Sequence, residues 1–117
     1  MTCDKGTKEI ILKIVDKIVK EYHQKKVILF GSYAYGTPHE NSDVDILVIM
    51  PARNEINQAV RIQMAVHAPF SMDLIVRTPE HLRKRLEEGH PFFVEVMGQG
   101  KVLHEKANRP GRLLGRG

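Results

Sequence analysis

Two aspartates one residue apart, Asp43 and Asp45, form the clearest chemical pattern in the sequence. They open the apolar, β-branched run 44–50, which predicts a strand. Because side chains alternate along a strand, both carboxylates project from one face, about 6.5–7 Å apart at their Cα atoms. Two carboxylates held in this way can share a divalent cation or bridge two of them. They are poor strand residues and repel each other, so the pair indicates a bound metal.

A second polar signal, Gly31-Ser32, ends the apolar run 27–30, which also predicts a strand. A glycine at this point lets backbone N–H groups approach an anion closely, and the serine hydroxyl adds another donor. A helix beginning there would add a favourable dipole. With phosphate held at one end of the polar loop and metal at the other, the stretch 27–50 predicts a site for a metal-bound nucleotide.

The spacing of these residues carries a family resemblance. Gly31-Ser32, ten residues and then Asp43-Val44-Asp45 resembles the signature of the nucleotidyltransferase superfamily, which includes DNA polymerase β and kanamycin nucleotidyltransferase. The full pattern should arise by chance at roughly one start position in 10⁵. The short chain is most similar to the minimal nucleotidyltransferases, which are commonly paired with HEPN-domain partner proteins. The resemblance covers roughly residues 27–104.

An acid also interrupts the apolar run 70–77, which predicts a third strand. Asp73 in such a strand is costly unless it is paired or bound to a metal. Members of the superfamily typically carry a third carboxylate on the strand beside the Asp-x-Asp strand, and Asp73 matches that position. The alternative is a salt bridge from Asp73 to Arg77 or Arg61.

The resemblance implies a reaction and a role for each residue. Asp43, Asp45 and Asp73 would be catalytic and would bind two Mg²⁺ ions, for which Mn²⁺ could substitute, while Gly31 and Ser32 would bind the nucleotide. The reaction would transfer a nucleoside monophosphate, AMP from ATP, to a hydroxyl group and release pyrophosphate. The acceptor implied is a tyrosine of a HEPN-domain toxin, which would make this chain an antitoxin.

Three alternatives to this reaction stay open. The chain could modify a small molecule, as kanamycin nucleotidyltransferase does, and complete its pocket as a homo-oligomer. It could neutralise a toxin by binding alone. It could act on nucleic acid, against which the neutral charge of residues 1–105 counts.

The loop shows one departure from its relatives, because Tyr35 stands where they often carry an arginine. Tyr33 and Tyr35 are therefore either contact residues or packing residues. None of the six histidines has metal-ligand spacing to another, and His39, in the loop, is the one placed to touch a ligand.

The remaining patterns predict a single α/β domain over residues 1–105, with a small mixed sheet and helices chiefly on one side. Apolar spacing favours a helix from Thr7, as N-cap, to Tyr22, and a second from about residue 54 to His67 with Met64 in the core. A cap, a proline and an acid at Thr78-Pro79-Glu80 start a third helix, ending at Gly89. A short helix over 91–97 and a strand over 101–104 complete the domain.

Charge and composition restrict the setting. The net charge of +4 comes from the tail 106–117, which contains Lys106, Arg109, Arg112 and Arg116 and should be disordered. No apolar run approaches membrane-spanning length. The start of the chain lacks an apolar signal region, and Cys3 is the only cysteine, so a cytoplasmic location is expected.

Overall fold

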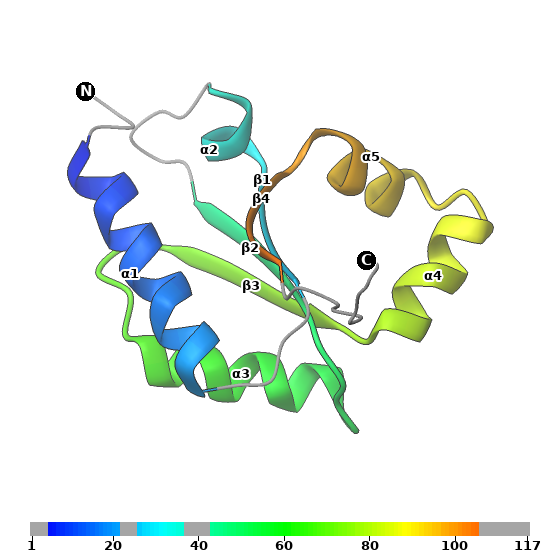
Figure 1. Ribbon diagram of the computed structural model, residues 1–117, viewed down its shortest axis with the longest axis horizontal. Coiled ribbons are helices and arrows are strands. Elements are labelled where there is room, and N and C mark those ends of the chain that lie inside the picture. The colour runs from blue at the N-terminus through cyan, green and yellow to red at the C-terminus, as the bar shows by residue number, and fades with distance from the viewer. Residues whose placement is uncertain (1–4, 22–25, 37–42, 106–117) are drawn as a thin grey trace, which may run out of the picture.

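A computed structural model describes residues 5–21, 26–36 and 43–105, which build a four-stranded mixed sheet with helices on both faces (Figure 1). The strands lie in the order β3-β2-β1-β4, and their bounds are β1 (Lys26–Phe30), β2 (Val44–Ile49), β3 (Met72–Arg77) and β4 (Lys101–Glu105). Strand β1 is antiparallel to β2 and β4, whereas β2 and β3 are parallel. The predicted α/β class and mixed sheet are confirmed.

The two faces of the sheet carry separate apolar clusters, because side chains alternate along each strand. One face packs against α1 (Lys5–Glu21) and α3 (Glu55–Val66). Its cluster includes Ile14, Ile18, Leu29, Ile46, Val48, Ile62, Val66 and Leu74. The other face packs against α4 (Pro79–Glu87) and α5 (Pro91–Gln99), through Ile28, Phe30, Leu47, Ile49, Leu82, Phe93 and Val96. The two longer helices cover one face, and the two short helices form a smaller layer on the other, so the helices are divided between both faces rather than lying chiefly on one (Figure 1).

Side-chain caps begin two of the helices, and the predicted cap at Thr78 is confirmed. The Asn54 side chain accepts a hydrogen bond from the Asn57 N–H at 3.0 Å and caps α3. The Thr78 hydroxyl accepts one from the His81 N–H at 3.1 Å and caps α4. The prediction for Thr7 was wrong: α1 already begins at Lys5, so Thr7 lies inside the helix rather than at its cap. A threonine can cap only where the backbone turns out of helical geometry.

The prediction of a core position for Met64 was also wrong, because its side chain is 68 % exposed. Helix α3 turns Ile62 and Val66 into the core. A residue two positions from Ile62 is rotated by about 200° around the helix and therefore faces solvent.

Some predictions lie outside the described residues. These are the tail 106–117, His39, Cys3 and Tyr22. Among the helices that are described, none is long and apolar enough to cross a membrane.

Candidate functional site

Strand pairing brings two of the predicted carboxylates together. Strands β2 and β3 run parallel with Asp45 and Asp73 as Cα partners. Partners in neighbouring strands lie about 4.8 Å apart and project from the same face. Asp43 immediately precedes β2, and both Asp43 and Asp73 act electrostatically on Asp45. The structure therefore places all three predicted acids in one neighbourhood, at the start of β2 and β3.

The negative charges of these three acids have no positive partner among the described residues. Burial, then the charge of Asp73 and then that of Asp43 raise the pKa of Asp45 to about 6. No ion pair formed within residues 5–21, 26–36 and 43–105 involves any of the three acids. Arg77, the alternative partner for Asp73, instead approaches Glu55 at 4.0 Å. Asp45 is partly buried whereas Asp43 and Asp73 are exposed, and such a group of like charges without a counter-charge favours a bound cation.

Gly31 touches this acidic group. It follows Phe30, the Cα partner of Asp45 across β1 and β2. Its φ of 75° lies in the left-handed region, and a Cβ added there would collide with the Asp45 carboxylate. Only glycine fits this position without strain. The two ends of the predicted site, which are separated in sequence by the polar loop, therefore meet at one corner of the sheet.

Ser32 opens α2 (Ser32–Tyr35), directly after this glycine. The first N–H groups of a helix have no partner within it and are free to meet an anion. Because α2 is a single turn, it has little helix dipole, so any attraction of an anion here would come mainly from these N–H groups and the Ser32 hydroxyl.

The two tyrosines of α2 have different surroundings. Tyr33 packs against the cluster beneath α1, which confirms a packing role for one of the pair. Tyr35 is 38 % exposed, and its hydroxyl donates to Glu95 Oε2 at 3.5 Å, a contact that joins α2 to α5.

Helix α5 is part of the surroundings that sequence patterns did not reveal. The ring of Phe92 lies 5.5 Å from that of Phe30, edge to face, beside the strand position that pairs with Asp45. Tyr35 and Glu95 are 60 residues apart. No local pattern announces a contact over that separation.

The three acids have the chemistry of metal ligands, but their side chains are not arranged around one metal position. Carboxylate oxygens are the ligands that Mg²⁺ prefers, and three of them share this corner. Within the described part of the chain, however, no three His, Cys, Asp or Glu side chains are already arranged around a common metal position. The donor set therefore fits a hard divalent cation in chemical type, although the three carboxylates do not surround a common metal position in this structure.

A second polar cluster, at the far end of β3, is centred on Glu55. Its carboxylate accepts from the Thr78 N–H at 2.9 Å and lies 2.9 Å from His81 Nδ1. Burial by itself would raise the pKa of Glu55. The hydrogen bonds from Thr78 and His81, with the charges of His81 and Arg77, lower that pKa below its ordinary value. Arg85 Nε donates to His81 Nε2 at 3.3 Å. This Glu55 network was not predicted from the sequence. The Glu55 carboxylate finds its hydrogen-bond donors and positive charge within the described part of the chain.

Comparison with known proteins gives consistent matches. Residues 9–102 match the family model described as a nucleotidyltransferase domain. A protein from Methanocaldococcus jannaschii, provisionally named a protein adenylyltransferase, is 31 % identical over 80 residues, which cover 68 % of this chain and 78 % of the relative. Another from that organism, named in the same way, is 31 % identical over 88 residues, covering 69 % of this chain and 88 % of the relative.

Two solved structures share the fold. One is a nucleotidyltransferase, provisionally named, from Sulfolobus solfataricus, with a TM-score of 0.59 and 18 % identity over 84 % of this chain and 79 % of that one. The other is a toxin–antitoxin structure with AMP-PNP, with a TM-score of 0.51 and 25 % identity over 81 % of this chain and 73 % of that one.

Proposed function

The chain belongs to the nucleotidyltransferase domain family and is a nucleotidyltransferase, and from this premise we propose that it transfers AMP from ATP to a tyrosine hydroxyl of a partner protein. The observation that supports the site assignment is the pairing of Asp45 with Asp73, with Gly31 against the Asp45 carboxylate. Metal ligands and phosphate donors of the proposed site therefore lie within reach of one triphosphate.

In this proposal Asp43, Asp45 and Asp73 would hold two Mg²⁺ ions. Bound there, the ions would supply positive charge that neutralises the triphosphate and lowers the pKa of the acceptor hydroxyl. The open backbone at Gly31 and the hydroxyl of Ser32 bind the phosphate oxygens. Because the pKa of Asp45 is raised to about 6 in the free protein, a cation bound at this corner would favour its charged form.

The chemical step is a substitution at phosphorus. The acceptor oxygen forms a bond to the α-phosphorus, the bond from that phosphorus to the bridging oxygen of the β-phosphate breaks, and pyrophosphate leaves with the electron pair. Asp73, on the exposed edge strand of the site, takes the acceptor proton.

The acceptor is proposed to be a protein for two reasons. Relatives carry the name protein adenylyltransferase, and a structural neighbour is a toxin–antitoxin protein with a nucleotide analogue. The domain is also small, so an acceptor pocket has to come from another molecule. We propose that this molecule is a HEPN-domain toxin and that the chain acts as its antitoxin, in the cytoplasm.

The test measures the acceptor directly. The chain is incubated with ATP and Mg²⁺ together with a purified HEPN-domain protein, or with kanamycin, and AMP addition is followed by mass spectrometry. Addition to a tyrosine of the protein is expected. Addition to kanamycin alone would overturn the protein acceptor while leaving the transferase assignment intact.

Calorimetry separates the site from the acceptor. ATP should bind feebly in EDTA, because the triphosphate faces three carboxylates, and Mg²⁺ or Mn²⁺ should restore binding. Equal ATP affinity with and without the metal would contradict the carboxylate site.

A further inference from the structure

The solvent side of α3 carries an apolar stripe formed by Ile56, Val60 and Met64. Their side chains are 74 %, 49 % and 68 % exposed. Residues four apart stack above one another on a helix, so the three make one continuous row. Single exposed apolar residues are ordinary on a protein surface, whereas a row at helical spacing is typical of a surface that receives a partner helix.

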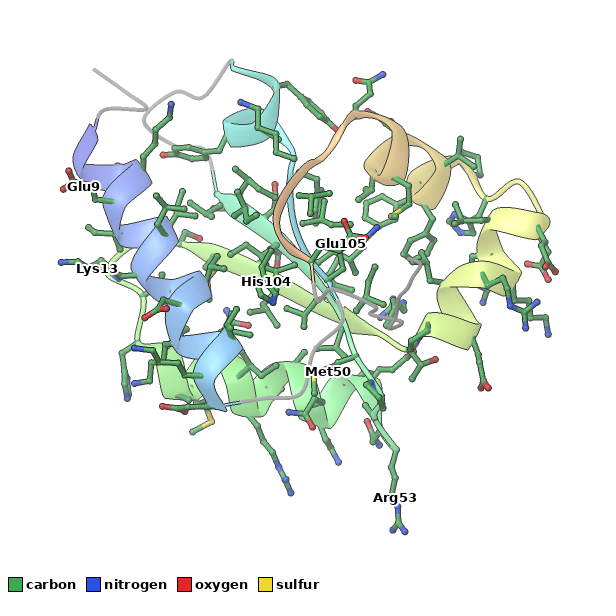
Figure 2. The ribbon with its side chains drawn as sticks, viewed as in Figure 1. Glu9, Lys13, Met50, Arg53, His104 and Glu105 are labelled. Carbon is green, nitrogen blue, oxygen red and sulfur yellow. The ribbon has the colours of Figure 1, made fainter. Side chains whose placement is uncertain are left out.

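Positive charge borders the stripe. Arg61 is exposed beside Val60, and Arg53 is exposed before the helix and points away from the body of the molecule (Figure 2). The one acid of α3, Glu55, is turned aside: its side chain is 20 % exposed and engaged with Thr78 and His81. Beside the stripe α3 also exposes the neutral Asn57 and Gln63, so the exposed charge on this side of the helix is positive.

A second copy of the chain fits this surface poorly. A twofold interface places the same residues opposite one another, so pairing through the stripe would bring the two Arg61 guanidinium groups together.

A lipid surface is also a poor match. Membrane-surface helices are rich in Lys and Arg along a whole polar face and present a large apolar face. Helix α3 has twelve residues with one arginine among them, and it is packed on the sheet through Ile62 and Val66.

We propose that the stripe of Ile56, Val60 and Met64 is a docking surface for an acidic amphipathic helix of a partner protein. Apolar residues of that helix would cover the stripe, and its acids would meet Arg53 and Arg61. Because α3 packs on the face of the sheet opposite to Asp45, an occupied stripe leaves the nucleotide corner open. The inference does not depend on the proposed transfer reaction.

The experiment uses two labelled helical peptides of 20 residues that share one leucine stripe and differ only in flanking Glu or Lys. Fluorescence anisotropy with the full chain should show the acidic peptide binding about tenfold or more tightly than the basic one, and more weakly as salt rises. Val60→Ser should weaken binding about tenfold. Arg61→Glu should reverse the preference between the peptides.

Two control variants match these changes. Val94→Ser removes an exposed valine of α5, and Lys84→Glu reverses an exposed charge of α4, and neither should alter peptide binding. Thermal melts check folding, and Met64→Ser replaces Val60→Ser if the latter lowers the melting temperature.

Four outcomes would overturn the proposal: no binding of either peptide, equal binding of both, a dimer of the chain that Val60→Ser abolishes in sedimentation, or co-sedimentation with phosphatidylserine vesicles that Val60→Ser abolishes. The third would assign the stripe to a second copy, and the fourth to a membrane surface.

Discussion

Two groups of charged side chains lie at opposite ends of β3 and differ in how their acids are compensated. At its start, Asp73 joins Asp45 and Asp43, and the pKa of Asp45 rises to about 6 because of burial and the neighbouring acids. At its end, Glu55 is surrounded by donors and cations, which outweigh its burial and lower its pKa.

The difference separates a stabilising arrangement from a functional one. Like charges in a partly buried setting oppose folding, whereas a carboxylate held by N–H groups and cations favours it. The Glu55 network is explained by the fold alone. The acidic corner costs the metal-free fold stability, and the fold alone does not explain it, as the proposed cation site does.

Replacing Asp45 by Asn should have the largest effect. The substitution keeps the shape and removes a proposed metal ligand, so nucleotide transfer should fall by about three orders of magnitude or more. It also removes one of the repelling charges, so the melting temperature in EDTA at neutral pH should rise. Melts of both proteins in EDTA and in Mg²⁺-ATP test this, and a mutant that melts lower in EDTA yet is still stabilised by Mg²⁺-ATP would refute the assignment.

Gly31→Ala should come next. The added Cβ meets the Asp45 carboxylate, and the left-handed φ strains alanine. Displacing the acid by about 1 Å should lower transfer about a hundredfold. Gly98→Ala is the matched control, because a Cβ there meets nothing within 4 Å among the described residues, and its activity should not change. If the two variants are equally active, Gly31 does not position Asp45.

Glu55→Gln should act on stability in the opposite direction to Asp45→Asn. It leaves Arg77 without its counter-charge, weakens the acceptor that faces the Thr78 N–H and His81 Nδ1, and should cost about 1–3 kcal/mol. Urea unfolding measures the loss. Glu87→Gln, which removes an exposed acid paired with Arg83, should cost less than about 0.5 kcal/mol. Equal losses in both would mean that the Glu55 network stabilises no more than a surface pair.

The smallest effects concern pH, and their signs oppose one another. The folded protein raises the pKa of Asp45 to about 6, so a charged Asp45 lowers the free energy of unfolding. This loss of stability is absent below the ordinary pKa near 4, where Asp45 is protonated in both the folded and the unfolded chain. It grows as the pH rises from there and is complete above about 6. The gain in melting temperature from Asp45→Asn should therefore grow between these values. Glu55 has a lowered pKa, so its stabilisation is present above its ordinary pKa and is lost as the pH falls through the lowered one. The loss from Glu55→Gln should shrink only in acid. Melting temperatures of the wild type and both variants are measured without metal over this pH range. The assignments would be contradicted if Asp45→Asn and Glu55→Gln changed the melting temperature in the same direction with the same dependence on pH.

Much of the scaffold was predictable because its signals are local. Alternation and β-branching marked the four strands, and Asn54 and Thr78 marked two helix starts. The candidate site residues could also be picked out from the sequence, because alternation along a strand predicts that Asp43 and Asp45 project from the same side. Met64 was misplaced because the apolar spacing of α3 covers both of its sides, and periodicity alone does not tell which side meets the sheet.

By itself, the sequence determined which segments form strands, that Thr78 begins a helix, and that a glycine, a serine and two acids bracket one polar loop. Only the tertiary structure decided that β2 and β3 pair in parallel with Asp45 opposite Asp73, that Glu55 meets Thr78 and His81 across 23 and 26 residues, and that α3 leaves an apolar row in solvent. The physical reason is the range of the interactions. Side-chain alternation and capping act within a few residues, whereas register, charge compensation and exposure depend on which distant segments pack together.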